Sequence, residues 1–142
     1  MKFQFSLDSV LKVRNHEQKM KKQKLAEEMA HKQEIIKLRE QIKDKLSGYL
    51  QDDDSEQIMN VQQVRQKAAH IQQVHEKMKK LSDELGRADL KVSKARKHLA
   101  DAHKNLHIIE KVKEFEHAAF KENVDREEQK FMDEIATQSY SR

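Results

Sequence analysis

The sequence predicts an all-α protein: a long antiparallel two-helix coiled-coil hairpin with helix two extending beyond helix one. The 142 residues include two Gly and no Pro, the residues that most often mark turns, so the chain can reverse direction at few places. A seven-residue apolar repeat fills much of the second half, and one earlier segment combines helix-stop and helix-start signals. We predict a single coiled-coil hairpin over 1–142, with helix one at about 6–48, the turn at about 48–57 and helix two at about 57–136.

Helix one has a predicted start at the N-terminus of the chain. Ser6 is placed to cap it, and Asp8 falls in the first turn, where the helix dipole favours negative charge. Phe5 precedes the cap and is spaced to pack on Val10 as a hydrophobic staple. We therefore expect the helix to begin near Leu7.

The predicted turn follows Gly48, which can end helix one as a C-cap glycine. The acidic and serine residues at 52–56 suit the start of the next helix, and Gln57 lies three residues after Asp54, as in a capping box. The run 52–56 lacks the alternating acidic positions and central Gly of a calcium loop, so we interpret it as helix capping.

The apolar repeat of helix two is the strongest pattern in the sequence. It runs without a polar interruption and imposes a left-handed supercoil against a partner helix. Three successive d positions are Ala, so the partner must come close or the seam is underpacked there. The a positions are Ile71, Met78, Leu85, Val92, Leu99 and Leu106, and the d positions are Val74, Leu81, Ala88, Ala95, Ala102 and Ile109.

The repeat fails at the next two positions, Lys113 and Glu116. Folding the chain about the midpoint of the predicted turn pairs residues whose numbers add to about 105. This places Ser6 opposite residue 99, and Ala88 and Ala95 opposite the apolar-poor stretch around Arg14 and Gln18. Helix two then has no partner in the hairpin from about residue 110. An unpaired apolar stripe typically marks a binding surface. Its large members are Phe115, Phe120, Phe131 and Ile135.

Composition excludes several classes of function. The chain has no Cys, which removes disulfides and thiolate chemistry, and its two Gly leave no phosphate-binding loop or nucleophile elbow. No apolar run approaches the roughly 20 residues of a membrane span, and the start lacks a signal-peptide core, so we expect a cytoplasmic protein. We expect no enzyme activity and no cofactor.

Two histidine pairs and one basic run leave alternatives open. His103 with His107, and His70 with His75, have helical or near-helical spacing for a metal, but a stable site needs three or four ligands, so we expect solvated or rim histidines and no metal. The basic run 19–24 supports an alternative function as a coiled-coil binder of nucleic acid or of a membrane surface. It is Lys-based and is followed by a hairpin rather than a zipper, so we expect no nucleic-acid partner.

The two ends of the chain resemble the FliJ family of flagellar type III export proteins, and the resemblance covers the full length. The residues that carry it are Phe3, Phe5, Leu7, Val10, Leu11, Arg14 and Glu17 at the start, and Arg126, Gln129, Lys130, Met132, Asp133, Glu134 and Ala136 at the close. The resemblance implies a non-enzymatic stalk like the rotor of rotary ATPases, whose terminal end enters the hexameric export ATPase and whose turn end reaches the membrane export gate. It also implies the escort of empty export chaperones.

The resemblance further implies site residues and a location. Tyr49 and His75 look like identities with the family, whereas Val64 and Ala68 are smaller than their counterparts, which makes the contact smaller or shifted. The expected location is the cytoplasm, peripherally at the inner face of the membrane. The equivalent stalk of a virulence-type injectisome is the alternative, and homo-oligomer formation stays open. The implied gate contacts are Ile42, Tyr49, Val64, Ala68, Ile71 and His75, and the ATPase contacts are Phe115, Phe120, Phe131 and Ile135.

Overall fold

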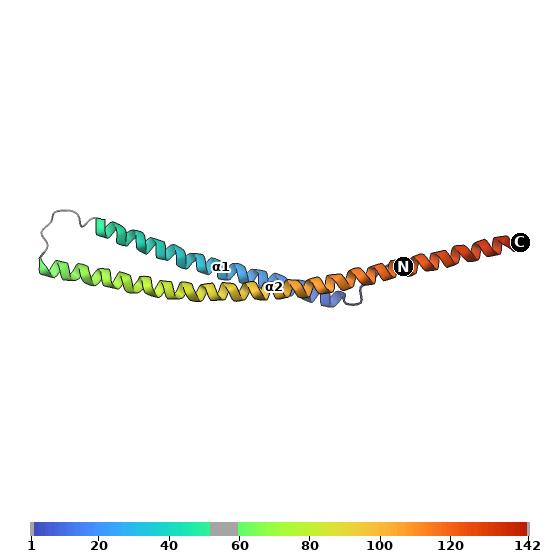
Figure 1. The fold of residues 1–142 in the computed structure, drawn as a ribbon, viewed down its shortest axis with the longest axis horizontal. Coiled ribbons are helices and arrows are strands. Elements are labelled where there is room, and N and C mark those ends of the chain that lie inside the picture. The colour runs from blue at the N-terminus through green and yellow to red at the C-terminus, as the bar shows by residue number, and fades with distance from the viewer. Residues whose placement is uncertain (1, 52–59, 142) are drawn as a thin grey trace. The chain divides into compact units, whose positions relative to one another are not determined.

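The computed structural model describes residues 2–51 and 60–141. It contains two α-helices, α1 (Asp8–Gln51, 44 residues) and α2 (Val61–Tyr140, 80 residues), and no strand within the described residues (Figure 1). The two helices pack against each other in antiparallel directions, and α2 is the longer. The predicted all-α hairpin is therefore confirmed.

The start of α1 differs from the predicted cap. The helix begins at Asp8, and the first amide to bond back across a full turn is that of Leu11, 2.9 Å from the carbonyl oxygen of Leu7. Ser6 lies in a turn before the helix, and its hydroxyl donates to the distant carboxylate of Glu116. The chain therefore uses Ser6 to join two segments, and the predicted cap is wrong.

The two helix ends at the turn also differ from the sequence prediction. α1 continues past Gly48 to Gln51, and Gly48 does not have a positive φ, so it is an interior helix residue and forms no C-cap. The predicted capping box of Asp54 and Gln57 lies outside the described residues. α2 instead begins after Asn60. Gln63 lies three residues after Asn60, the same spacing as between Asp54 and Gln57.

Asn60 and Gln63 form a reciprocal capping box at the start of α2. The amide of Gln63 donates to the side-chain oxygen of Asn60 at 2.8 Å, and the amide of Asn60 donates to the side chain of Gln63 at 3.2 Å. Each bond satisfies a backbone donor that the first turn of a helix leaves without a partner. This pair fixes where α2 begins.

The chain divides into two compact units, and each is described by itself. The first comprises residues 1–21 with 99–142, and the second comprises residues 22–98. In the first, Gln18 lies 2.8 Å from His103, and the numbers of this pair add to 121. In the second, Lys32 forms an ion pair with Asp89 at 2.6 Å, which gives the same sum.

The register predicted from the turn midpoint is therefore wrong by about sixteen residues. Residue numbers across the hairpin add to about 121 rather than 105. The shifted helix ends, Gln51 for α1 and Val61 for α2, explain less than half of this error. The rest arises because the hairpin is not symmetric about the midpoint of its turn, since Gln51 lies level with about residue 70 of α2. As a consequence Ser6 lies opposite Glu116, and Ala88 shares a groove with His31 rather than facing the stretch 14–18.

The buried core consists of few and mostly small side chains. In the first unit the buried residues are Phe5, Ala102 and Leu106, and in the second they are Ile35, Ala88, Val92 and Ala95. The three seam alanines are only 2–7% exposed. The backbones therefore approach closely at these positions, which is the first of the two alternatives that the sequence left open.

The half-buried stripe of α2 continues beyond Ile109, in contrast to the prediction. Its next members follow at intervals of three or four residues and are Val112, Glu116, Phe120 and Val124. The three intervals from Ile109 to Phe120 add to eleven residues. An eleven-residue spacing rotates the stripe in the opposite sense to a seven-residue spacing. The loss of the heptads thus marks a change of period, and the N-terminal segment still reaches this part of α2.

The new register can be tested with spin labels in the second unit. We expect labels at Gln41 and Lys80, whose numbers add to 121, to lie much closer than labels at Gln41 and Val64, whose numbers add to 105. The sixteen residues between the two α2 positions correspond to about 24 Å of helix. Electron spin resonance distances that rank the pairs in the opposite order would restore the midpoint register.

The capping box can be tested by substitution. We expect Asn60→Ala to destabilise the first turn of α2 by about 0.5–2 kcal/mol, because a backbone amide loses its acceptor. Hydrogen exchange at residues 61–64 should become faster, whereas Gln62→Ala, at a position with no capping bond, should leave it unchanged. Equal exchange in both variants would contradict the assigned helix start.

Candidate functional site

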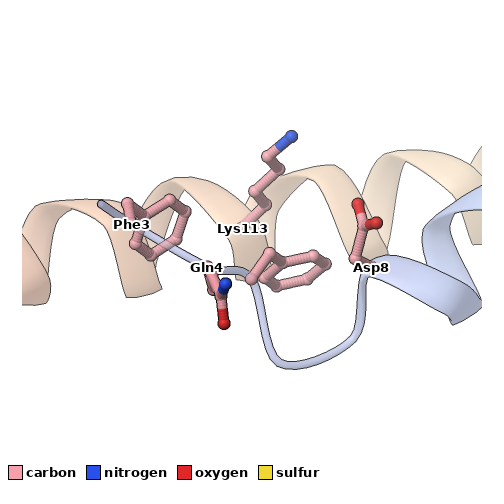
Figure 2. A pocket seen from close by; sticks show the side chains of 5 residues that line it. Phe3, Gln4, Asp8 and Lys113 are labelled. Atoms are coloured by element: carbon pink, nitrogen blue, oxygen red, sulfur yellow. The ribbon is translucent and has the colours of Figure 1, made fainter. Parts of the chain in front are cut away.

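The non-helical N-terminal segment lies along α2 and is held there by aromatic side chains. The ring of Phe3 packs edge-on against His117, with centroids 4.9 Å apart, and tilts against Phe120 at 5.5 Å. Both separations are in the range preferred by interacting aromatic pairs. Phe5 is 8% exposed, the lowest value in this segment. Figure 2 shows Phe3 and Gln4 of this segment and Asp8 at the start of α1 beside Lys113 of α2.

A polar contact fastens the same segment. The backbone amide of Ser6 donates to one carboxylate oxygen of Glu116 at 3.3 Å, and the Ser6 hydroxyl donates to the other at 2.5 Å. Bonds to an ionised acceptor are shorter and stronger than neutral ones. Glu116 is therefore a half-buried d-position residue with a specific polar partner, which explains why the apolar repeat is interrupted there.

The pocket between this segment, Asp8 and Lys113 does not have the chemistry of a catalytic site. The pocket in Figure 2 is lined by Phe3, Gln4, Phe5, Asp8 and Lys113. Its carboxylate, on Asp8, is paired with Lys12 at 3.3 Å on the outer surface of α1. The pocket offers no nucleophile beside a general base. Such a surface suits contacts with another protein better than a reaction.

Three of the four predicted ATPase contacts are exposed, and the fourth is covered. Phe115 is 74% exposed, Phe131 is 63% exposed and Ile135 is 47% exposed. Phe120 is half-buried against Phe3, so the prediction that α2 has no partner in the hairpin from residue 110 is wrong as far as Phe120. Met132 was not among the predicted ATPase contacts, although it is as exposed as Phe131.

The four predicted residues do not share one helix face. At about 100° per residue, Phe131 lies about 20° from Phe120 round the helix, and Ile135 lies at a similar offset from Val124. Phe115 lies about 140° from Phe120 on the same measure. We define the tail stripe as Phe120, Val124, Phe131 and Ile135. Phe115 projects from a different side of α2.

The predicted gate contacts centre on Tyr49. Its ring packs against His70 with centroids 5.0 Å apart, and the ammonium of Lys67 lies 5.6 Å from the ring centre. This places Tyr49 beside the stretch of α2 that contains Ala68 and Ile71. Lys67 was not among the predicted gate contacts, and the sequence suggested His70 only as a possible metal ligand.

The other predicted gate contacts divide into exposed and seam residues. Val64, Ala68 and His75 are exposed, whereas Ile42 and Ile71 are half-buried in the seam. By the register of this unit, Ile42 lies level with about residue 78 of α2, beyond His75. The structure therefore groups Tyr49 with the α2 residues of the set and leaves Ile42 at its margin.

Neither histidine pair is part of a metal-binding cluster. Within 2–51 and 60–141, no three His, Cys, Asp or Glu side chains are grouped to hold an ion. His103 lies against Gln18, and His70 lies against Tyr49. In the same described ranges, neither helix has a stretch long and apolar enough to cross a membrane.

Comparison with known families gives a match that covers almost the whole chain. Residues 2–142 match the family described as "Flagellar FliJ protein". Neither the curated proteins nor the solved structures gave a significant match. The family assignment therefore depends on the full-length match and on the helical hairpin that accompanies it.

Proposed function

Because this chain belongs to the FliJ family of flagellar proteins, we propose that it is a stalk that links the hexameric export ATPase to the membrane export gate. Membership makes it a protein of flagellar type III export, in a family of non-enzymatic export components. The family match favours this system over the injectisome alternative. The link to the two named partners is our proposal, and the tail stripe is the observation that carries it.

The tail stripe is suited to dock on the ATPase. Phe131 and Ile135 project from a helix end that extends past the N-terminal segment (Figure 1). Apolar side chains at helical spacing are how a helix binds in a groove of another protein. Residues 122–141 carry six acidic and two basic groups, so the complementary groove would be apolar with a basic rim.

The surface around Tyr49 is the proposed gate contact. Tyr49, Val64 and Ala68 are each exposed, and an exposed aromatic ring with small apolar groups is a combination typical of protein interfaces. His75 adds a polar edge on the same helix. Ile42 and Ile71 contribute chiefly to the seam, and their role would be to hold the two helices at this end.

The helix α2 contributes residues to both proposed surfaces. Val64, Ala68 and His75 of the proposed gate contact and the whole tail stripe lie on it, and no described residue of α2 has a cis peptide or a positive φ. α2 contains no Pro, and its one glycine, Gly86, lies within the helix. We infer that the stalk acts mechanically, by biasing the conformation of the ring and of the gate.

Two further roles follow from the sequence. The escort of empty export chaperones is proposed on the family alone, and no surface is assigned to it. The exposed lysines of the run 19–24 support a weaker alternative, binding to phosphates of nucleic acid or lipid. Phosphate binding weakens steeply with salt, whereas an apolar tail docked in a protein groove does not. A salt titration of ATPase binding separates these mechanisms.

The ATPase contact is tested by removing the two exposed stripe residues. We expect Phe131→Ser with Ile135→Ser to weaken binding to the export ATPase at least about a hundredfold if their effects add, since each buried apolar side chain contributes about 1.5–3 kcal/mol. Gln129→Ser with Asp133→Ser is the matched control, because these two side chains bond each other on another face at 3.1 Å. Equal affinities for both variants, measured by calorimetry, would refute the assignment of the tail stripe.

The gate contact is tested by a second double variant. Tyr49→Ala with His75→Ala should lose binding to the cytoplasmic part of the export gate and keep its affinity for the ATPase. Leu50→Ala with Glu76→Ala changes the neighbouring positions, about 100° round each helix, and should bind both partners normally. Unchanged gate binding by the first variant would show that the family contact does not carry over to these residues.

A further inference from the structure

The N-terminal segment covers one end of the tail stripe. Phe3 packs on Phe120, which shares a face of α2 with Phe131, whereas Phe131 itself is open to solvent. We propose that residues 2–6, which we name the clasp, form an autoinhibitory contact that must leave Phe120 before the export ATPase binds at full affinity. This inference rests on the proposed docking of the ATPase along the tail stripe.

The clasp and a protein partner compete for the same surface. A partner that follows the stripe from Ile135 towards the hairpin reaches Phe120 next after Val124, and there it meets the ring of Phe3. Two occupants cannot contact one face of Phe120 together. Binding along the full stripe and closure of the clasp are therefore coupled equilibria. A closed clasp lowers the affinity for the partner, and a bound partner lowers the fraction of closed clasp.

The clasp is built to be released. Residues 2–5 lie outside α1, and the backbone angles at Ser6 and Leu7 set the direction in which they leave it. Phe3 is half-buried and Phe5 is buried, whereas Lys2 and Gln4 are exposed. This alternation is expected of an extended segment that lies on a surface. The entropy gained when such a segment is freed offsets a large part of its contacts.

The carboxylate of Glu116 holds the clasp on α2 by hydrogen bonds from Ser6. Glu116 accepts both the amide and the hydroxyl of Ser6, and it is the residue that replaces an apolar side chain in the seam. Its carboxylate holds the chain at the point where the clasp leaves α1, so the segment before it is directed along α2. Loss of this contact frees the clasp without removing any residue of the tail stripe.

The size of the effect follows from the fraction of open clasp. The apparent dissociation constant equals the intrinsic constant divided by the fraction of molecules in the competent state. If roughly one molecule in ten is open, full release strengthens binding by at most about tenfold. We therefore expect Phe3→Ala with Ser6→Ala to bind the ATPase about three- to tenfold more tightly than the unaltered chain.

The matched control changes the two outward-facing residues of the clasp. Lys2→Ala with Gln4→Ala removes side chains that are exposed, so affinity for the ATPase should not change. A readout without the ATPase follows the clasp itself. A fluorinated phenylalanine at Phe120 should show a more solvent-exposed ¹⁹F resonance when Phe3 and Ser6 are replaced, and an unaltered one in the control.

A cross-link tests the closed state. The chain contains no Cys, so Ser6→Cys with Glu116→Cys can be joined specifically by a short, cleavable thiol-reactive linker. The linked protein should bind the ATPase at least tenfold more weakly than the same protein after cleavage of the linker. Comparing one variant before and after cleavage removes any effect of the substitutions themselves.

The outcomes separate this inference from the proposed function. Weaker or unchanged ATPase binding by Phe3→Ala with Ser6→Ala, while the Phe131 and Ile135 variant still loses binding, overturns the clasp and leaves the tail stripe in place. Normal ATPase binding by the Phe131 and Ile135 variant refutes the docking proposal, and the clasp then has no partner to inhibit. Tighter binding together with the shifted ¹⁹F resonance supports the clasp.

Discussion

Close contact between the two helices at small seam residues is the constraint on which the structure depends. Ala88, Ala95 and Ala102 are buried because the backbones approach closely there, yet alanine contributes little apolar area at about 25 cal/mol per Å². The seam therefore determines the spacing of the helices more than their stability. Cross-helix polar pairs such as Lys32 with Asp89 add specificity, although an exposed ion pair of this kind contributes only about 0–1 kcal/mol.

This weak seam explains which part of the fold the sequence could predict. Low Gly and Pro content and an apolar repeat suffice for two long helices, and both are present. The register needs more, because sliding one helix past another by whole heptads returns a and d positions to the seam. The predicted register is wrong by about sixteen residues, which is close to two heptads. The Asn60 and Gln63 box fixes the start of α2, and its spacing was visible in the sequence.

The candidate site was predictable where it depends on periodicity and not where it depends on contacts between distant residues. The sequence predicts exposure of Phe131 and Ile135 because it leaves that end of α2 without a partner, and both are exposed beyond the part of α2 that the N-terminal segment covers. The cover over Phe120 was missed because Glu116 was interpreted as the end of pairing. A carboxylate in a seam position also signals a polar partner, since a half-buried charge needs hydrogen bonds. Ser6 is that partner, and it brings Phe3 and Phe5 with it.

The placement of aromatic residues connects the packing with the proposed function. The seven Phe and Tyr residues lie at positions 3, 5, 49, 115, 120, 131 and 140, so the long stretches 6–48 and 50–114 contain none. Aromatic side chains carry much of the binding energy in protein interfaces. The large apolar side chains that these two stretches expose, such as Leu38, Leu90 and Ile108, are aliphatic, and the aromatic side chains lie towards the two proposed binding surfaces. Phe3 and Phe5 then have a distinct use: at the terminal surface they supply the chain with its own competitor for an aromatic stripe.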